Sequence, residues 1–406
     1  MFGASSPTSG GVTLLSRKFD FYPVFVAIFV LLLVGSIHGV RWLPFYSYPG
    51  LDLQNLFVFH HQCPGWPIPY TESGAACGDP LERAMVYPPL AYWTMSWVRL
   101  FNFPTATLLW SVVVIGFTAL GMGLATCFEK TRRIGIMFIG LLLFFQMPML
   151  YAIERGNIDA LVIPLFMGGS YFLSMRRGFL AGLLFATASW MKVYPVIPSA
   201  MVMAGFFLDR DLRKTAFPGL LKGFIVGGTV WALLLFPDSY RYIADVLPRF
   251  ATEKGGFGVS SHTLYRGWPS LFVKLPVLTL WTYFFSRIFR RDPLFALSAL
   301  LAISTFFQNL SNDYNLITAY PFLFLVLLRL LRRGMDWKDL GILILTFQAF
   351  VGDRTLVEGL LDTRGALFTQ IIWFVAFPFY ALNRIDKSAW PDGNLPYDEK
   401  SIYHRN

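Results

Sequence analysis

The sequence predicts an all-α polytopic membrane protein with about twelve transmembrane helices, since a helix needs roughly 20 apolar residues to cross a bilayer. Its 406 residues are 55% hydrophobic and only 14% charged, whereas about 25% of residues are charged in a soluble domain. Apolar runs recur along the whole chain, which contains 41 Phe and 12 Trp. Small clusters of Arg and Lys separate these runs, as cytoplasmic loops do under the positive-inside rule.

The net charge of +10 does not indicate nucleic-acid binding. Nucleic-acid-binding proteins usually present a basic patch interleaved with aromatic residues, and no such patch occurs in this sequence. The bias of cytoplasmic loops toward Lys and Arg explains the charge better. We therefore expect membrane lipid, and no nucleic acid, as a partner.

The N-terminal segment 1–20 is polar and is predicted to be a cytoplasmic tail. A basic pair precedes the first span, Phe21–Val40, and no small-residue cleavage site follows it, so a signal anchor is favoured over a cleaved signal peptide. Residues 21–382 form one predicted membrane domain. Residues 383–406 form a second cytoplasmic tail, so both termini lie inside.

Two large outer loops are predicted, at residues 41–104 and 237–269. The first contains YPPLAYWTMSWVRLF (Tyr87–Phe101), which is apolar but short. If this segment crossed the membrane, the next span, Thr105–Phe128, would deliver the basic EKTRR segment to the outside. A re-entrant or interfacial helix keeps EKTRR inside, and the charge rule favours that interpretation.

The same alternation assigns the remaining spans. They are Ile134–Ala152, Ala160–Ser174, Phe179–Met191, Val196–Leu208, Pro218–Phe236, Ser270–Phe289, Pro293–Leu310, Asn315–Leu331, Leu340–Val351 and Ala366–Leu382. Phe179–Met191 and Val196–Leu208 are short and have basic segments on both flanks. We interpret them as a hairpin of two short helices, which membrane proteins tolerate where helices line a cavity.

This topology gathers polar residues from distant segments on the outer face. The set comprises Asp52, Glu154, Asn157, Asp159, Lys192, His262, Arg266, Asn312 and Asp313. Ionisable groups at membrane depth are costly and usually functional. Their convergence predicts one site on the outer side of the membrane.

Each of these motifs also has a structural explanation. Asp52, in YPGLDLQNLF, is placed to cap a helix N-terminus, and Asn157 or Asp159, in ERGNID, to cap the helix that follows. Lys192, in WMKVYP, can be a snorkelling lysine. A lone loop histidine such as His262 is usually solvated, and SNDYN can be a capping turn. ERGNID nevertheless holds more ionisable and amide groups than one cap requires.

The order of the motifs is more specific than any one of them. Asp52 is followed by YPPL at Tyr87–Leu90, GNID at Gly156–Asp159, KVYP at Lys192–Pro195 and SNDYNL at Ser311–Leu316. This ordered set resembles glycosyltransferase family 87, the polyprenyl-phosphate-mannose-dependent mannosyltransferase group of the GT-C superfamily. Members of that family often have Asn-x-Ser in the second outer loop, where this chain reads VSSH, a difference that concerns the substrate more than the reaction class.

The resemblance implies a GT-C-like enzyme of the plasma or inner membrane. It implies transfer of a single sugar, with mannose favoured, from a polyprenyl-phosphate donor to a lipid-linked or glycan acceptor on the outer face. Inversion at the anomeric carbon is likewise implied by the family. A phosphate leaving group needs no strong general acid, unlike the leaving group in glycosidases. One base therefore suffices, and Asp52 is the candidate.

The remaining candidates divide by charge. Cations stabilise negative charge that develops on the lipid phosphate, and the candidates are Lys192, His262, Arg266 and Arg155. Candidates for binding or orienting the sugar and the acceptor are Glu154, Asn157, Asp159, Tyr87, Tyr194, Asn312 and Asp313. No His/Cys cluster has the spacing of a zinc site, and the resemblance favours metal independence, although the outer carboxylates leave a divalent cation open.

Cys63 and Cys77 both lie in the predicted first outer loop. An oxidising exterior would permit a disulfide between them, and the alternative is two free thiols.

Two other function classes remain open at this point. A secondary transporter has a similar number of spans, but carriers place polar residues near the midplane and often show repeat symmetry. Here the polar residues gather at the outer ends of spans, and two large loops break any symmetry. A lipid-linked polysaccharide polymerase or ligase shares the outer active face, so only its substrate distinguishes it.

Overall fold

The structure is a computed structural model of the whole chain. It describes residues 51–63, 68, 70, 87–127, 140, 143, 147–248, 255–256, 270–304, 307, 310–311, 313–333, 336–350 and 372–382. The predicted first span, Phe21–Val40, lies outside these residues, as do His262, Arg266 and Asn312. The described part is helical apart from one short parallel pairing, which confirms the predicted all-α class.

The helices fall close to the predicted spans. They are α4 (Phe103–Ala125), α6 (Met147–Arg155), α7 (Asp159–Ser174), α8 (Gly178–Met191), α9 (Val196–Leu208), α11 (Phe217–Leu234), α15 (Ser270–Ile288), α16 (Pro293–Ser304), α17 (Tyr320–Arg333), α18 (Trp337–Phe350) and a last helix, Ile372–Leu382. The bounds of α9 match the prediction at both ends. Asn102 caps α4 by accepting a hydrogen bond from the backbone N–H of Thr105.

Several predicted boundaries differ from the structure. In place of the predicted span Pro293–Leu310, α16 covers Pro293–Ser304, and Leu310 lies in the two-residue strand β2 (Leu310–Ser311). Glu154 and Arg155 lie in the last turn of α6 rather than in an outer loop, because α6 continues until Gly156 ends it with a φ of 68°. The predicted helix Asn315–Leu331 begins instead as a 3-10 helix, η5 (Asp313–Ala319), and becomes the α-helix α17 only at Tyr320. Proline is tolerated in a first helical turn, where its missing N–H costs nothing, and Pro321 lies in that turn of α17.

Two helices among the described residues, α4 and α11, are long and apolar enough to span a membrane. Only 33% of the apolar window of α4 and 17% of that of α11 are buried inside the protein. Leu108 and Val112 on α4, and Leu233 and Leu234 on α11, are exposed. Exposing apolar surfaces of this extent to water is unfavourable, and such surfaces mark interaction or membrane sites. Lipid is therefore the environment that fits them. The predicted total of about twelve spans stays a prediction.

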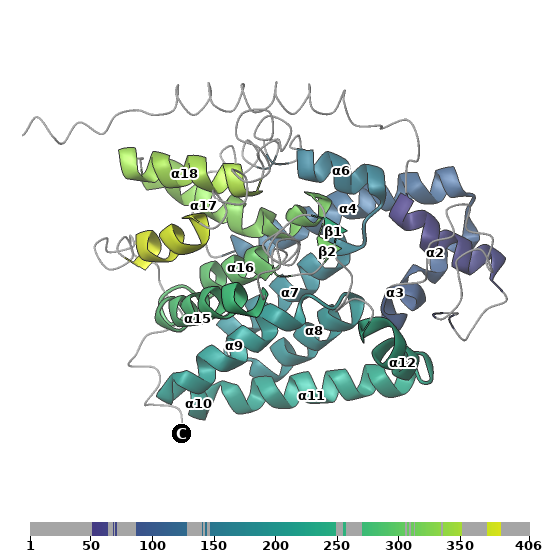
Figure 1. Cartoon of the computed structure of the whole chain (residues 1–406), viewed down its shortest axis with the longest axis horizontal. Helices are drawn as coiled ribbons and strands as arrows, with labels where there is room; N and C mark the ends of the chain where they lie inside the picture. The colour runs from purple at the N-terminus through teal and green to yellow at the C-terminus, as the bar shows by residue number, and fades with distance from the viewer. Residues whose placement is uncertain are drawn as a thin grey trace, which may run out of the picture.

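Glycines bring α8 and α11 into backbone contact (Figure 1). A Cβ atom at Gly223 would lie 2.0 Å from the carbonyl oxygen of Phe179, and one at Gly182 would lie 2.2 Å from that of Leu220. Small residues allow this approach in membrane proteins, where packing rather than hydrophobic burial holds helices together. The indole N–H of Trp231 also donates a hydrogen bond to the hydroxyl of Thr187 at 3.0 Å.

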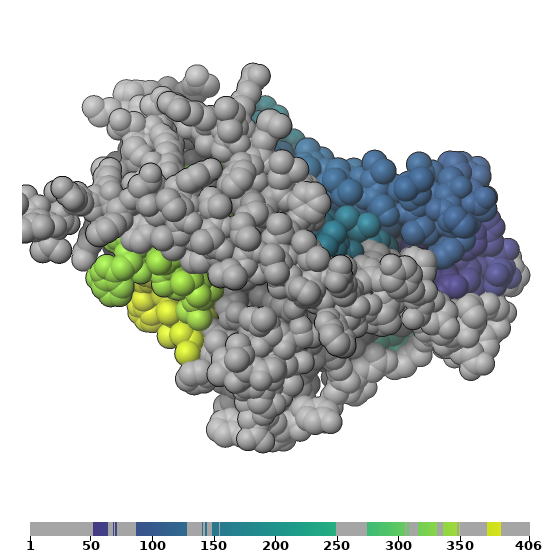
Figure 2. Space-filling view, turned by 90° about the horizontal axis from the view of Figure 1, so that it is seen from above, coloured from purple at the N-terminus to yellow at the C-terminus, as the bar shows by residue number. Residues whose placement is uncertain are grey.

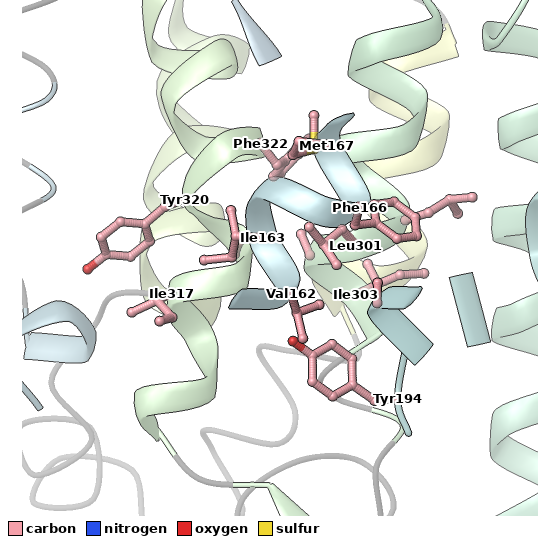
Figure 3. Packing of buried hydrophobic residues seen from close by; sticks show 14 of the residues in the cluster. Val162, Ile163, Phe166, Met167, Tyr194, Leu301, Ile303, Ile317, Tyr320 and Phe322 are labelled. Atoms are coloured by element: carbon pink, nitrogen blue, oxygen red, sulfur yellow. The ribbon is translucent and has the colours of Figure 1, made fainter. Parts of the chain in front are cut away.

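The core surrounds α7, whose buried side chains point in several directions. Val162, Ile163, Phe166 and Met167 pack among residues of α16, η5 and α17 (Figure 3). Tyr194, from the turn between α8 and α9, lies below Val162 in that view with its hydroxyl directed toward it. The core thus extends to the turn that carries Lys192.

The predicted outer and cytoplasmic elements lie at opposite ends of the protein. In Figure 1, α2 (Leu51–Gln62), α3 (Pro89–Thr94) and α12 (Asp238–Arg241) lie near one end of α11, and the basic helix α10 (Arg210–Thr215) lies near the other. Figure 2 shows the purple surface of α2 beside the blue surface of the helices that follow it. The arrangement agrees with the predicted alternation of the chain.

The YPPL segment forms a short, bent helix. It consists of α3 followed by a 3-10 helix, η2 (Met95–Leu100). These two pieces rise roughly 20 Å together, which is less than the bilayer core of about 30 Å. This length favours the re-entrant or interfacial helix over a transmembrane one.

Candidate active site

Asp52 lies in the first turn of α2, and its carboxylate faces the turn between α6 and α7. Asn157 Nδ2 donates a hydrogen bond to Asp52 Oδ2 at 3.1 Å. Arg155 Nη2 lies 3.4 Å from Asp52 Oδ1. Asp52 is only 9% exposed. α2, from the predicted first outer loop, and the ERGNID motif together bury this carboxylate, which Arg155 and Asn157 contact.

The ERGNID motif forms the turn from α6 to α7. Gly156 adopts a φ of 68°, a region that glycine enters without steric cost. The backbone N–H groups of Gly156 and Asn157 both donate to the carbonyl of Ala152, which closes α6. The chain then reverses within a few residues and begins α7 at Asp159.

Asn157 serves the helix start and the carboxylate at the same time. Its Oδ1 accepts a hydrogen bond from the backbone N–H of Asp159 at 2.7 Å, which is a local side-chain contact typical of helix starts. Its Nδ2 therefore points the other way, to Asp52. Asn157 is fully buried. Asn157 thus contacts both the start of α7 and the Asp52 carboxylate, and its role in a site stays a prediction.

Asp159 and Lys192 form a second ion pair beside the first. Lys192 Nζ lies 2.8 Å from Asp159 Oδ1, and the side chains are 15% and 0% exposed. Lys192 directly follows α8 in an extended conformation. Its ammonium group is therefore paired within the protein, which makes it more than the snorkelling lysine considered from the sequence.

Tyr194 packs beside Lys192 in the turn between α8 and α9. Its ring centroid lies 6.0 Å from Lys192 Nζ, and the side chain is buried. Burial raises the pKa of the Tyr194 hydroxyl well above its usual value, and the neighbouring Asp159 carboxylate adds to the rise. The hydroxyl is thus a protonated hydrogen-bonding group rather than a base.

The two ion pairs form one continuous network. Asn157 bonds the Asp52 carboxylate through its nitrogen and the Asp159 backbone through its oxygen. Asp159 then pairs with Lys192. Five of the predicted site residues, from three separate segments, therefore meet: Asp52, Arg155, Asn157, Asp159 and Lys192.

A histidine pair fastens α2 to the YPPL helix. His60 Nε2 lies 2.7 Å from the carbonyl oxygen of Tyr92, and His61 Nε2 lies 3.0 Å from that of Val98. Burial lowers the pKa of His60 to about 4. His60 is therefore neutral near pH 7 and donates its Nε2 proton to Tyr92. These contacts hold the helix that carries Asp52 in place.

This anchoring group was not predicted from the sequence. His60, His61, Asn55 and Tyr92 were not among the candidates, although HHQ at the end of an apolar run, LQNLFVF, was a visible signal. Two adjacent histidines on a buried helix require carbonyl or hydroxyl partners. The partners lie more than 30 positions away in the chain, so the sequence alone did not identify them.

Tyr87 joins an aromatic cluster at the start of the YPPL helix. Its ring centroid lies 6.2 Å from that of Tyr92, and its backbone carbonyl accepts a hydrogen bond from the hydroxyl of Tyr70 at 3.0 Å. The ring of Tyr70 also lies 5.6 Å from that of Tyr242. The Asp238 carboxylate accepts a hydrogen bond from the backbone N–H of Ile68. Tyr87 thus lies where the two predicted outer loops meet.

The remaining candidates are placed only in part. Glu154 lies in α6 and Asp313 begins η5, without described side-chain contacts. β1 (Gly255–Gly256) pairs in parallel with β2 (Leu310–Ser311), so the segment that leads to His262 and Arg266 starts beside SNDYN. η5 itself packs against α6 and α7. The roles predicted for His262, Arg266, Asn312, Asp313 and Glu154 stay predictions.

Two further features concern metals and cysteines. Within the described ranges, no group of three or more His, Cys, Asp or Glu side chains is arranged to hold a metal ion. Cys63 is disulfide-bonded. Cys77, its predicted partner, lies outside the described residues.

Comparison with known protein families identifies the family of this chain. The sequence profile of glycosyltransferase family 87 matches residues 85–311. This range contains the YPPL, ERGNID and KVYP motifs and reaches the first residue of SNDYN. No curated protein sequence matches the chain. The family consists of membrane glycosyltransferases, which act on a sugar donor and an acceptor. Because the profile covers more than half of the sequence, the chain belongs to glycosyltransferase family 87.

Proposed function

We propose that this glycosyltransferase moves a single sugar, with mannose favoured, from a polyprenyl-phosphate donor to a lipid-linked or glycan acceptor. The reaction takes place at the outer face of the plasma or inner membrane and inverts the anomeric carbon. One observation carries the proposal: the buried Asp52 carboxylate, held by Arg155 and Asn157, lies in one network with the Asp159–Lys192 pair.

Asp52 is the proposed general base. The acceptor hydroxyl donates its proton to the Asp52 carboxylate as its oxygen forms a bond to the anomeric carbon of the donor sugar. The bond from that carbon to the phosphate oxygen breaks, and its electron pair leaves with the polyprenyl phosphate. A nearby cation favours the ionised form of a carboxylate, which is the form that accepts a proton. Arg155 lies where it supplies this effect.

Lys192 is the proposed contact to the donor phosphate. An ammonium group has three N–H donors, and the pairing with Asp159 uses one direction. The others can point at phosphate oxygens, whose negative charge grows as the sugar leaves. His262 and Arg266 are proposed to add to this contact. Cationic side chains then do what a metal ion would do, and the proposed reaction needs no metal.

The proposed topology has about twelve spans with both termini in the cytoplasm. It is supported by the position of α2, α3 and α12 at one end of α11 and of the basic α10 at the other. The site network then opens to the outer side. The polyprenyl-phosphate donor reaches it from the outer leaflet.

A reconstituted assay tests the proposal. The purified protein in proteoliposomes receives radiolabelled polyprenyl-phosphate mannose, polyprenyl-phosphate glucose or a polyprenyl-diphosphate oligosaccharide. The acceptors are n-octyl α-D-mannopyranoside, n-octyl β-D-glucopyranoside and a total membrane lipid extract. We expect one labelled sugar per acceptor from the first donor, unchanged by EDTA.

Other outcomes of this assay contradict the proposal. Use of only the diphosphate oligosaccharide would assign the chain to the polymerase or ligase class. Activity that EDTA removes and a divalent cation restores would replace the metal-free mechanism. Uptake of a labelled solute without any transfer would support the transporter class, which the family match does not favour.

A further inference from the structure

Asn55 lies one helical turn beyond Asp52 on α2. Residues three positions apart on a helix share a face, with roughly 5–6 Å between their Cβ atoms. Asn55 is 3% exposed and Asp52 is 9% exposed. Any substrate that reaches the Asp52 carboxylate therefore comes within one helical turn of Asn55.

The amide of Asn55 has a defined orientation. The hydroxyl of Tyr92, on the YPPL helix, donates a hydrogen bond to Asn55 Oδ1 at 3.2 Å. Tyr92 is itself completely buried, and its backbone carbonyl holds His60. Because Oδ1 is occupied, Nδ2 points away from Tyr92 and presents its two N–H groups elsewhere.

Asn55 Nδ2 is a buried donor that has no hydrogen-bond partner within the described part of the chain. Buried polar groups in folded proteins are nearly always paired, so an unpaired one requires an explanation. Leaving the donor unpaired costs free energy that a leucine at the same position would not cost. Sites built to bind a substrate hydroxyl contain such groups, because they reject analogues that lack the hydroxyl.

We propose that Asn55 Nδ2 donates a hydrogen bond to a sugar hydroxyl oxygen in the bound complex, beside the hydroxyl that Asp52 deprotonates. This inference rests on the proposed function. An amide N–H is a neutral donor, which suits a hydroxyl oxygen, whereas the phosphate has cationic groups such as Lys192 nearby. Asn55 is then a specificity residue that distinguishes polyhydroxylated substrates from simple alcohols.

The sugar hydroxyl can belong to the acceptor or to the donor, and monodeoxy analogues separate the two. Wild-type protein is assayed with the acceptor glycoside that it uses and with each monodeoxy form of that glycoside. The same series is run with monodeoxy forms of the polyprenyl-phosphate sugar. We expect one analogue to lower kcat/KM by roughly 10- to 100-fold, as expected when a buried donor loses its partner.

The decisive measurement is the ratio of kcat/KM for the natural substrate to kcat/KM for the deoxy substrate, determined in variants. In Asn55→Leu, kcat/KM for the natural substrate falls roughly 10- to 100-fold, and the ratio between natural and deoxy substrate falls to about one. Since this variant leaves the Tyr92 hydroxyl without its acceptor, the double variant Asn55→Leu/Tyr92→Phe removes both groups together. It should fold as well as wild type and show the same loss of discrimination between the natural and the deoxy substrate.

Gln54→Leu is the matched control, since it removes an amide from another face of α2, where the side chain is half-buried. It should keep the wild-type ratio. If the double variant still discriminates the deoxy analogue as wild type does, the assignment of Asn55 is wrong. An equal loss for natural and deoxy substrates would give Asn55 a structural role only. Wild-type protein that transfers no sugar at all overturns the proposed function itself.

Discussion

Asn157 Nδ2 donates a hydrogen bond to Asp52 Oδ2 across 3.1 Å, between residues 105 positions apart in the sequence. The orientation of the amide is set by the backbone N–H of Asp159, which donates to Asn157 Oδ1. The position of the Asp52 carboxylate thus depends on the turn that Gly156 permits. Hydrogen bonds of this kind to a reacting group orient it for catalysis.

Asp52→Asn should lower transfer roughly 10²- to 10⁴-fold, because a general base contributes about this much to the rate. An asparagine keeps the shape and an oxygen that can accept from Asn157, so expression and donor binding should persist. Radiolabel transfer and donor binding are measured side by side. Asp238→Asn is the control, since Asp238 is another buried carboxylate of the predicted outer loops and accepts a hydrogen bond from the backbone of Ile68. Substantial transfer by Asp52→Asn would remove it as the base.

Asn157→Ala should lower kcat roughly 10- to 100-fold with little change in donor KM, because a misplaced catalytic group costs about this much. The acidic limb of the pH–rate profile should move to higher pH, since the amide stabilises the ionised carboxylate. Arg155, Asp159 and Lys192, the other described charges of the network, are unchanged in this variant.

The control for Asn157 is Asn102→Ala, which removes only the cap of α4. Loss of a cap costs about 1 kcal/mol of stability and should leave both kcat and the pH profile as in wild type. An unshifted acidic limb in Asn157→Ala, together with a lowered melting temperature, would reduce Asn157 to a helix cap.

Lys192→Met and Asp159→Leu should each lower stability by about 3–5 kcal/mol, because each leaves the opposite charge buried and unpaired. The double variant should recover most of that stability, since both charges are gone. It should not recover transfer if Lys192 also contacts the donor phosphate. Thermal unfolding in detergent and the transfer assay give the two readouts. Wild-type transfer by a stable double variant would show that the pair is structural.

Gly223→Ala should destabilise the protein strongly. The added Cβ would lie 2.0 Å from the carbonyl oxygen of Phe179, so α8 and α11 would have to separate. Gly116→Ala on α4 is the matched control, because a Cβ at that position meets nothing within 4 Å. Alanine is favoured over glycine inside a helix by about 1 kcal/mol, so Gly116→Ala should raise the melting temperature or leave it unchanged. Equal melting temperatures for the two variants would contradict the close contact.

Lowering the pH from 7 to 5 should destabilise wild-type protein through His60. Its pKa is about 4 in the folded protein and about 6.5 in an unfolded chain. Between these values the unfolded chain binds a proton that the folded one does not, so the free energy of unfolding decreases as the pH is lowered. His60→Gln keeps a donor for the Tyr92 carbonyl and should show a smaller loss of melting temperature. His61→Gln, on the exposed side of α2, should behave as wild type does.

The helices could be predicted from the sequence because their signals are local. Apolar runs flanked by basic clusters gave α7, α8 and α9 nearly residue by residue. The meeting of Asp52, ERGNID and Lys192 also followed, since the charge rule orders the spans and thereby sets which ends share a face. The 3-10 start at Asp313–Ala319 was missed because Leu316 and Ile317 continue the apolar run of α17, so the sequence does not separate the two helices.

The pairing inside the site could not be predicted in the same way. Arg155 and Lys192 were predicted from the sequence as phosphate ligands, but the sequence could not show that each lies against a carboxylate. The partners of Asn55 and His60 could not be predicted, because they come from the YPPL helix more than 30 residues later. Contacts of this kind depend on how two helices are docked, which periodicity and charge do not encode.

The glycine contact between α8 and α11 also decides which part of the site is able to move. Phe179 O and Gly223 meet backbone to backbone, with no layer of side chains between them that could deform. Lys192 directly follows α8, so its backbone is held by the same close contact. Any widening of the site is therefore expected where side chains of α2 bond the YPPL helix, rather than at Lys192. The α8–α11 pair is thus expected to be the rigid side of the site, and α2 with the YPPL helix the side that can move.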